Sequence, residues 1–178
     1  MKIGVISDTH LTAPKSGMFG SAAQKLRSTL TLDELRAILE RHFSGVELIL
    51  HAGDFVETAV AEMLQQIAPL KGVQGNMDLP DIHDHFPVKT TVTAQGFTIG
   101  LIHGSGAPHG LADRVAQEFE NVNAIVFGHS HQPMNEARNG VLLFNPGSPT
   151  DRIFAPYNSV GILHLDDTLR GEIIRLSS

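Results

Sequence analysis

The first half of the chain alternates short apolar runs with longer amphipathic stretches. Residues 2–7, 46–50 and 70–74 are short apolar runs of the kind that form buried strands. Between them, leucine and isoleucine recur at three- to five-residue steps over residues 21–45, and residues 58–67 are amphipathic, so we expect helices there. Strands that alternate with helices favour parallel β-α-β units.

A capping box marks one helix start inside the first helical stretch. Thr31 is followed three residues later by Glu34, a spacing in which each side chain can bond the other residue's backbone N–H. We therefore expect one broken helix or two short helices before Gly45, preceded by a loop over residues 12–20.

The second half of the chain is richer in strand patterns. Residues 88–93 and 97–102 flank Ala94-Gln95-Gly96, which predicts a hairpin, and residues 110–119 are helical in pattern. Pro80 and Pro87 bracket a segment that we interpret as a surface loop. Further strand-like runs lie at residues 124–127, 141–144, 160–165 and 172–176. A total of about ten strands favours two packed sheets over one open sheet, in a mixed α/β chain.

Composition and charge fit a single ordinary globular domain over residues 1–178. The chain is 42% hydrophobic and 18% charged, with a net charge of −6. Lysine and arginine are spread singly, so we expect no binding to duplex nucleic acid. No apolar run approaches the ~20 residues of a membrane span, and the N-terminal run is too short for a signal peptide. We therefore expect a cytoplasmic protein without membrane attachment. The absence of cysteine excludes disulfides and thiolate metal sites.

Five short polar motifs each supply a side chain that can ligate a metal ion. Most come directly after a strand-like run, so their side chains would converge where the strands end. Their donors are carboxylate, amide and imidazole groups, which suit borderline-hard divalent metals. In chain order the motifs are Asp8-Thr9-His10, Gly53-Asp54, Gly75-Asn76, His103-Gly104 and Gly128-His129-Ser130-His131.

Each motif taken alone also has an ordinary structural explanation. A Gly-Asp pair after a strand is often only a turn, Asn76 tolerates a left-handed turn, and His103 could be a hydrogen-bonded core residue. The Gly128–His131 motif is more specific, because two imidazoles two residues apart can reach adjacent ions from one loop. Taken together, the candidates are too many for one tetrahedral ion, and they fit two ions that share a carboxylate.

This ordered series resembles the signature of the calcineurin-like metallophosphoesterases. Residues 144–148, Phe-Asn-Pro-Gly-Ser, resemble the small bacterial and archaeal phosphodiesterases of that superfamily. The resemblance runs from residue 1 to about residue 165. It implies a four-layer α-β-β-α sandwich, in which helices flank two packed mixed sheets and the site lies at one end of the strands. It also implies a hydrolase that acts on a small phosphodiester.

The resemblance further implies how the ligands are shared between two divalent ions. Asp54, Asn76 and His103 are the residues that it implicates in catalysis, by in-line attack of a metal-bridging hydroxide. We expect manganese first, with iron, zinc and nickel as chemically suitable alternatives. Asp8, His10 and His131 would bind the first ion, and Asn76, His103 and His129 would bind the second. Asp54 would bridge the two ions.

The chain departs from the wider family at Met77. Many members carry histidine after the asparagine, as the proposed acid that protonates the leaving oxygen, whereas methionine has no proton to donate. The small phosphodiesterase branch commonly lacks this histidine too, so we do not interpret Met77 as inactivating. Loss of a general acid typically costs ~10²–10⁴-fold, so we expect phosphodiesters and phenolic leaving groups to be better substrates than alkyl monoesters.

Three further residues could support the site, each with an ordinary explanation as well. His109 lies in a glycine-rich loop after His103 and could contact substrate, replace the missing acid or be a solvated loop residue. Arg152 could clamp a phosphate or simply be exposed. Asp78 could fasten a ligand through a hydrogen bond or be a turn residue.

Two competing functions are consistent with parts of this pattern. The small subunit of the retromer coat resembles the same fold and serves mainly as an interaction scaffold, but it carries aspartate at the position of Asn76. A mononuclear redox site of two histidines and one carboxylate could also be drawn from these residues, and the surplus of ligands argues against it. An edge of either sheet could support a homo-oligomer.

Overall fold

The computed structural model describes residues 1–12 and 30–176, and it contains two five-stranded mixed sheets. The first sheet has the order β10-β9-β1-β2-β3, and its three strands from the N-terminal half are parallel. Strands β9 and β10 join them antiparallel. The bounds of these strands are β1 Lys2–Ile6, β2 Leu48–His51, β3 Leu70–Gly72, β9 Ser159–Leu165 and β10 Leu169–Arg175.

The second sheet has the order β4-β5-β6-β8-β7. Its three inner strands β5, β6 and β8 are parallel, and each edge strand pairs antiparallel with its neighbour. The bounds are β4 Lys89–Ala94, β5 Phe97–Ile102, β6 Ala124–Val126, β7 Met134–Arg138 and β8 Val141–Asn145. In both sheets, therefore, a group of parallel strands ends at the same edge.

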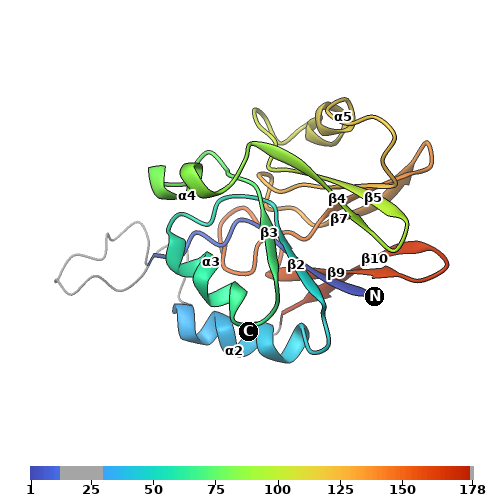
Figure 1. Ribbon diagram of the computed structural model, residues 1–178. Helices are drawn as coiled ribbons and strands as arrows, with labels where there is room; N and C mark the ends of the chain where they lie inside the picture. Colours follow the sequence, from blue (N-terminus) through green and yellow to red (C-terminus); the bar gives the residue numbers. More distant parts are fainter. Residues whose placement is uncertain (13–29, 177–178) are drawn as a thin grey trace.

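Helices cover the outer faces of the two sheets and complete four layers (Figure 1). Helices α2 (Leu32–His42) and α3 (Thr58–Gln65) bury apolar side chains with β1 and β2 of the first sheet, and α5 (Leu111–Ala116) packs against the second sheet. A third apolar cluster fills the space between the sheets. This arrangement confirms the expected α-β-β-α sandwich. None of the helices in residues 1–12 and 30–176 combines the length and the apolar character needed to cross a membrane.

Local sequence signals explain most of these elements. Thr31 caps α2, and both reciprocal bonds of the capping box with Glu34 are present, as expected. The predicted hairpin is formed by β4 and β5, with Gln95 and Gly96 both at positive φ in its turn. Residues 13–29, which include most of the expected loop and the start of the first helical stretch, lie outside the described residues.

Two elements differ from the expectation. The segment interpreted as a surface loop contains a short helix, α4 (Pro80–His85), which has proline in its first turn and buries only Ile82. The edge strand β7 was not predicted, because its sequence, Met-Asn-Glu-Ala-Arg, lacks the apolar alternation of a half-buried strand. It forms through backbone pairing with β8 rather than through burial of its own side chains.

Candidate metal centre

The predicted ligands converge at the carboxyl ends of the parallel strands of both sheets. Asp8 and His10 come after β1, Asp54 after β2, and Asn76 after β3. His103 comes after β5, and the loop with His129 and His131 comes after β6. The structure therefore brings all seven predicted side chains to one edge of the sandwich, although they lie far apart in the sequence.

Four of these side chains form one compact cluster. The ligand atoms of Asp8, His10, Asp54 and His131 all lie within 4.8 Å of one another, so these groups could hold a metal ion. His10 Nε2 is 3.2 Å from His131 Nε2 and 3.5 Å from Asp54 Oδ2. His131 Nε2 in turn is 3.3 Å from Asp8 Oδ1.

The other three predicted ligands adjoin this cluster. His103 Nε2 lies 3.4 Å from the same Asp54 Oδ2 that faces His10, so this carboxylate oxygen stands between the two imidazoles. His129 Nδ1 lies 2.9 Å from Asn76 Oδ1. When the other ring nitrogen of His129 donates to Gly106 O, these two atoms present facing lone pairs, an arrangement that a cation would satisfy.

His103 provides the clearest sign that a cation belongs here. Its Nδ1 donates to the carbonyl of Ala52 at 2.6 Å, which directs Nε2 at the carboxylates. Nε2 is buried, and its contacts among the described residues are ion contacts with Asp54 Oδ2 at 3.4 Å and Asp8 Oδ1 at 4.0 Å, without a well-formed hydrogen bond. A buried polar atom without a well-formed hydrogen bond is costly unless a ligand completes it. The donor set and this open nitrogen therefore fit a divalent metal ion.

Burial and charge act against each other in the metal-free site. Burial disfavours the imidazolium of His103, but the carboxylates of Asp54 and Asp8 outweigh it and raise its pKa to about 9. The pKa of His131 also rises to about 9, because Asp8 and Asp151 overcome the effect of burial. Burial favours the neutral acid of Asp54, yet the neighbouring histidines and the Met77 N–H lower its pKa to about 2. The carboxylates of Asp8 and Asp54 thus favour positive charge on the histidines beside them.

The backbone of the ligand loops lies in an uncommon conformation. Five of the seven candidates have positive φ, which non-glycine residues adopt rarely and mostly at functional sites. Backbone bonds between the loops stabilise this geometry: Asp8 N–H donates to Gly53 O, and His10 N–H donates to Asp54 O. The five residues are Asp8, His10, Asp54, His129 and His131, with φ between 47° and 67°.

Glycines in the motifs make room for ligands on neighbouring loops. A Cβ at Gly75 would lie 2.2 Å from Asp54 Oδ1, and a Cβ at Gly128 would lie 1.9 Å from the Ser7 hydroxyl that bonds Asp8. Any larger residue would displace a candidate ligand of another strand. The recurring glycine beside a ligand therefore has a steric reason.

Asp78 ties two of the ligand loops together through their backbones. Its carboxylate accepts N–H bonds from Asp54, Val56 and Gly75, at 3.2, 2.6 and 2.7 Å. Burial raises its pKa above the ordinary value. The sequence left Asp78 open between a turn residue and a support of the site, and the contacts place it among the supports.

Asp151 is a supporting residue that the sequence analysis did not find. Its buried carboxylate lies 2.7 Å from His131 Nδ1 and accepts N–H bonds from Ile153, Phe154 and Ala155. A carboxylate on the far nitrogen fixes the tautomer and orientation of a ligating imidazole, here with Nε2 toward the cluster. The only local signal was an aspartate shortly after a strand and a Pro-Gly turn.

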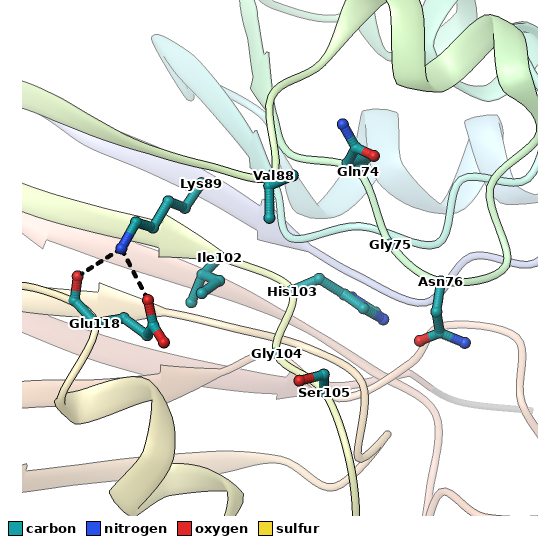
Figure 2. Close-up of a pocket in the computed structure, with 10 residues that line it drawn as sticks. All are labelled: Gln74, Gly75, Asn76, Val88, Lys89, Ile102, His103, Gly104, Ser105 and Glu118. Carbon is teal, nitrogen blue, oxygen red and sulfur yellow. Dashed lines mark hydrogen bonds and ion pairs between the residues drawn. The ribbon is translucent and has the colours of Figure 1, made fainter.

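Two cavities flank the candidate ligands and meet at Asn76. The smaller, about 300 Å³, lies over the compact cluster and is lined also by Met77 and Phe154. The larger, about 400 Å³, extends past His103 to Lys89 and Glu118 (Figure 2). His109 and Arg152 are exposed, and neither belongs to the lining of these two cavities, so their contact with substrate stays a prediction.

Comparison with known proteins is consistent with this geometry. Residues 1–168 match the calcineurin-like phosphoesterase superfamily domain. A probable metallophosphoesterase of Methanothermobacter thermautotrophicus is 35% identical over 183 residues, covering 98% of this chain and 92% of the relative. A phosphodiesterase of Methanocaldococcus jannaschii is 25% identical over 161 residues, covering 83% of each chain. The structure of Vps29 from Entamoeba histolytica complexed with Zn²⁺ has a TM-score of 0.67 at 21% identity, covering 98% of this chain and 99% of that one, and shows the shared fold.

Metal binding should release protons near neutral pH. His103 and His131 have pKa values of about 9 in the metal-free protein, so both are protonated at lower pH, and a metal ion binds only the neutral imidazole. We expect manganese binding at about pH 7.5 to release about two protons, and fewer above about pH 9.5. Calorimetry in buffers of different ionisation enthalpy measures this number, and an absence of proton release at the lower pH would contradict it.

Removal of the Asp151 carboxylate should weaken metal binding. We expect Asp151→Asn to lower the affinity for the first manganese ion about 10–100-fold, because His131 loses the charge that orients it. The exposed Asp84→Asn serves as a matched control. Equal manganese affinity of Asp151→Asn and the control, measured by calorimetry, would show that Asp151 supports only the loop.

Proposed function

Since the chain belongs to the calcineurin-like phosphoesterase superfamily, we propose that it is a phosphodiesterase that requires two divalent metal ions. Asp8, His10 and His131 would hold the first ion, the second would be held by Asn76, His103 and His129, and Asp54 would bridge them. The observation that carries this proposal is the position of Asp54 Oδ2, between His10 Nε2 at 3.5 Å and His103 Nε2 at 3.4 Å. One carboxylate oxygen shared by two imidazoles supports a bridging role.

The chemistry is determined by the charge of the assembled site. When bound, two divalent ions lower the pKa of a coordinated water, so that hydroxide is available for in-line attack, and stabilise charge on the phosphoryl oxygens. Asp8 and Asp54 neutralise only half of the four positive charges if the imidazoles stay neutral. The remaining charge favours an anionic phosphate ester. Ala52 O and Asp151 hold His103 and His131 with Nε2 toward the site.

Met77 bears on which leaving groups the site can expel. Its backbone N–H donates to Asp54 Oδ1 at 2.8 Å, and the residue lines the cavity above the cluster. The position used for a general acid in many relatives is therefore at the site but holds a thioether. Substrates whose leaving group needs no proton would react best. The phosphodiesterase among the relatives supports the choice of diesters.

An interaction scaffold is the competing function, and the likeness to Vps29 is compatible with it. Such a scaffold should expose apolar side chains for a partner. Met77 and Phe154 are about half exposed and line the cavity over the candidate ligands, whereas Leu79 and Ile153, at 44% and 56% exposure, line neither cavity. Asn76 among the ligand side chains favours catalysis over the scaffold.

Manganese is our proposal for the metal, with iron, zinc and nickel suited to the same mixed oxygen and nitrogen donors. We further propose that the protein acts in the cytoplasm on a small phosphodiester. An edge of either sheet could also support self-association.

Hydrolysis of two p-nitrophenyl esters tests this function. We expect chelated protein to regain activity with manganese and to hydrolyse bis-p-nitrophenyl phosphate faster than p-nitrophenyl phosphate. Asp54→Asn and His103→Ala should each lose more than about 100-fold, above the loss typical of residues that only support a ligand. The exposed His83→Ala, outside the site, should retain activity.

The role of Met77 can be separated in the same assays. We expect Met77→His to accelerate alkyl esters, which need a proton on the leaving oxygen, more than p-nitrophenyl esters, which do not. Equal effects on both would contradict the missing-acid explanation. Folded protein that shows no hydrolysis with any divalent metal would contradict the proposed function and favour the scaffold.

A further inference from the structure

We propose that the 400 Å³ cavity beside His103 binds one organic substituent of the phosphodiester, and that this substituent is uncharged, ring-bearing and polar at its edges, like a nucleoside. The inference rests on the proposed function, because it needs a phosphate seated at the candidate metal ligands. It goes further by assigning a substituent site and the chemical class that the site accepts.

The position of the cavity connects it to the reacting phosphate. Asn76 and His103 form one end of its lining, and both belong to the candidate ligand set. The second cavity shares Asn76 and covers the compact cluster. A diester carries two organic groups, and the two cavities lead away from the same point. The volume of about 400 Å³ falls within the ~300–1,000 Å³ of small-molecule sites.

The walls of the cavity combine an apolar surface with hydrogen-bonding groups. Val88 and Ile102 lie between His103 and the far end, as Figure 2 shows. Val88 is 65% exposed, so its side chain is accessible to a group that enters this cavity. Gln74 and Ser105 add polar groups. The Gln74 amide donates to Phe86 O at 2.8 Å, which fixes the side chain and leaves its Oε1 without a donor among the described residues.

The far end of the cavity argues against a second phosphate on the substituent. Lys89 is the only lysine or arginine among the described residues that line this cavity, and its Nζ donates to the Glu118 carboxylate at 2.8 Å and to Glu118 O at 3.1 Å. Its Nζ also lies 5.6 Å from the Phe119 ring centroid. An additional phosphate would meet the Glu118 carboxylate and a lysine that is already engaged. A long acyl chain would likewise end against this ion pair, which leaves a compact uncharged group as the occupant.

Equilibrium binding to the manganese-loaded protein tests the site without relying on turnover. Inorganic phosphate and thymidine 5′-monophosphate carry similar charge, so the difference in their affinities reports the nucleoside alone. We expect the nucleotide to bind at least about tenfold more tightly by calorimetry. Val88→Trp should remove this advantage, because the indole fills the cavity, while the affinity for inorganic phosphate stays unchanged.

A second pair of variants tests the charge of the far end. We expect wild-type protein to bind thymidine 3′,5′-bisphosphate no more tightly than the monophosphate. Glu118→Gln should improve the bisphosphate several-fold relative to the monophosphate, because it removes the repelling carboxylate and frees Lys89. Glu136→Gln is the matched control, since Glu136 is an exposed partner of Arg138 outside the cavity. Melting temperatures confirm that each variant is folded.

The outcomes separate this inference from the proposed function. Phosphate binding without any gain from the nucleoside would overturn the substituent site alone. A gain that survives Val88→Trp would also overturn it, because the nucleoside would then lie elsewhere. An equal response of Glu118→Gln and Glu136→Gln would overturn the uncharged class. Absence of binding for phosphate and nucleotide alike would instead contradict the phosphate site on which the proposed function depends.

Discussion

Charge balance at the strand ends is the constraint on which the site depends. Asp8 and Asp54 are almost fully buried, at 0% and 2% exposure, and buried carboxylates are costly unless positive charge or hydrogen bonds stabilise them. In the metal-free protein that charge comes from protons on His103 and His131, whose pKa values rise to about 9. Divalent ions would take the place of these protons, which explains why the same side chains can be stable in a buried cluster and available as ligands.

The rest of the fold holds the loops that carry these groups. Parallel strands in each sheet end at one edge, and the turns after them adopt left-handed backbone conformations at five candidate ligands. Asp78 bonds the loops after β2 and β3, and Asn145 at the end of β8 donates to Gly128 O in the loop after β6. Small residues at Gly75 and Gly128 permit the close approach of neighbouring loops. These bonds and close contacts hold the ligand residues in their uncommon left-handed conformations.

Sequence reasoning succeeded where a local pattern determines both a strand and the polar turn at its end. Apolar runs that lead into Asp8, Asp54 or His103 located the strands and their polar ends, and the order of the motifs identified the family. Asp151 escaped notice because an aspartate after a Pro-Gly turn has no feature that separates it from a turn former; its bond to His131 exists only in the folded chain. The cavity between Gln74 and Glu118 was equally invisible, since its walls come from segments far apart in sequence. The edge strand β7 depends on its partner β8 rather than on its own composition.

The number and position of bound metal ions test the central claim most directly. Crystals of chelated protein reloaded with manganese would locate the ions by anomalous scattering. We predict two ions, both in contact with Asp54, one beside His10 and His131 and the other beside Asn76 and His103. A single ion held by the compact cluster of Asp8, His10, Asp54 and His131, with Asn76 and His129 uninvolved at saturating manganese, would contradict the two-metal site.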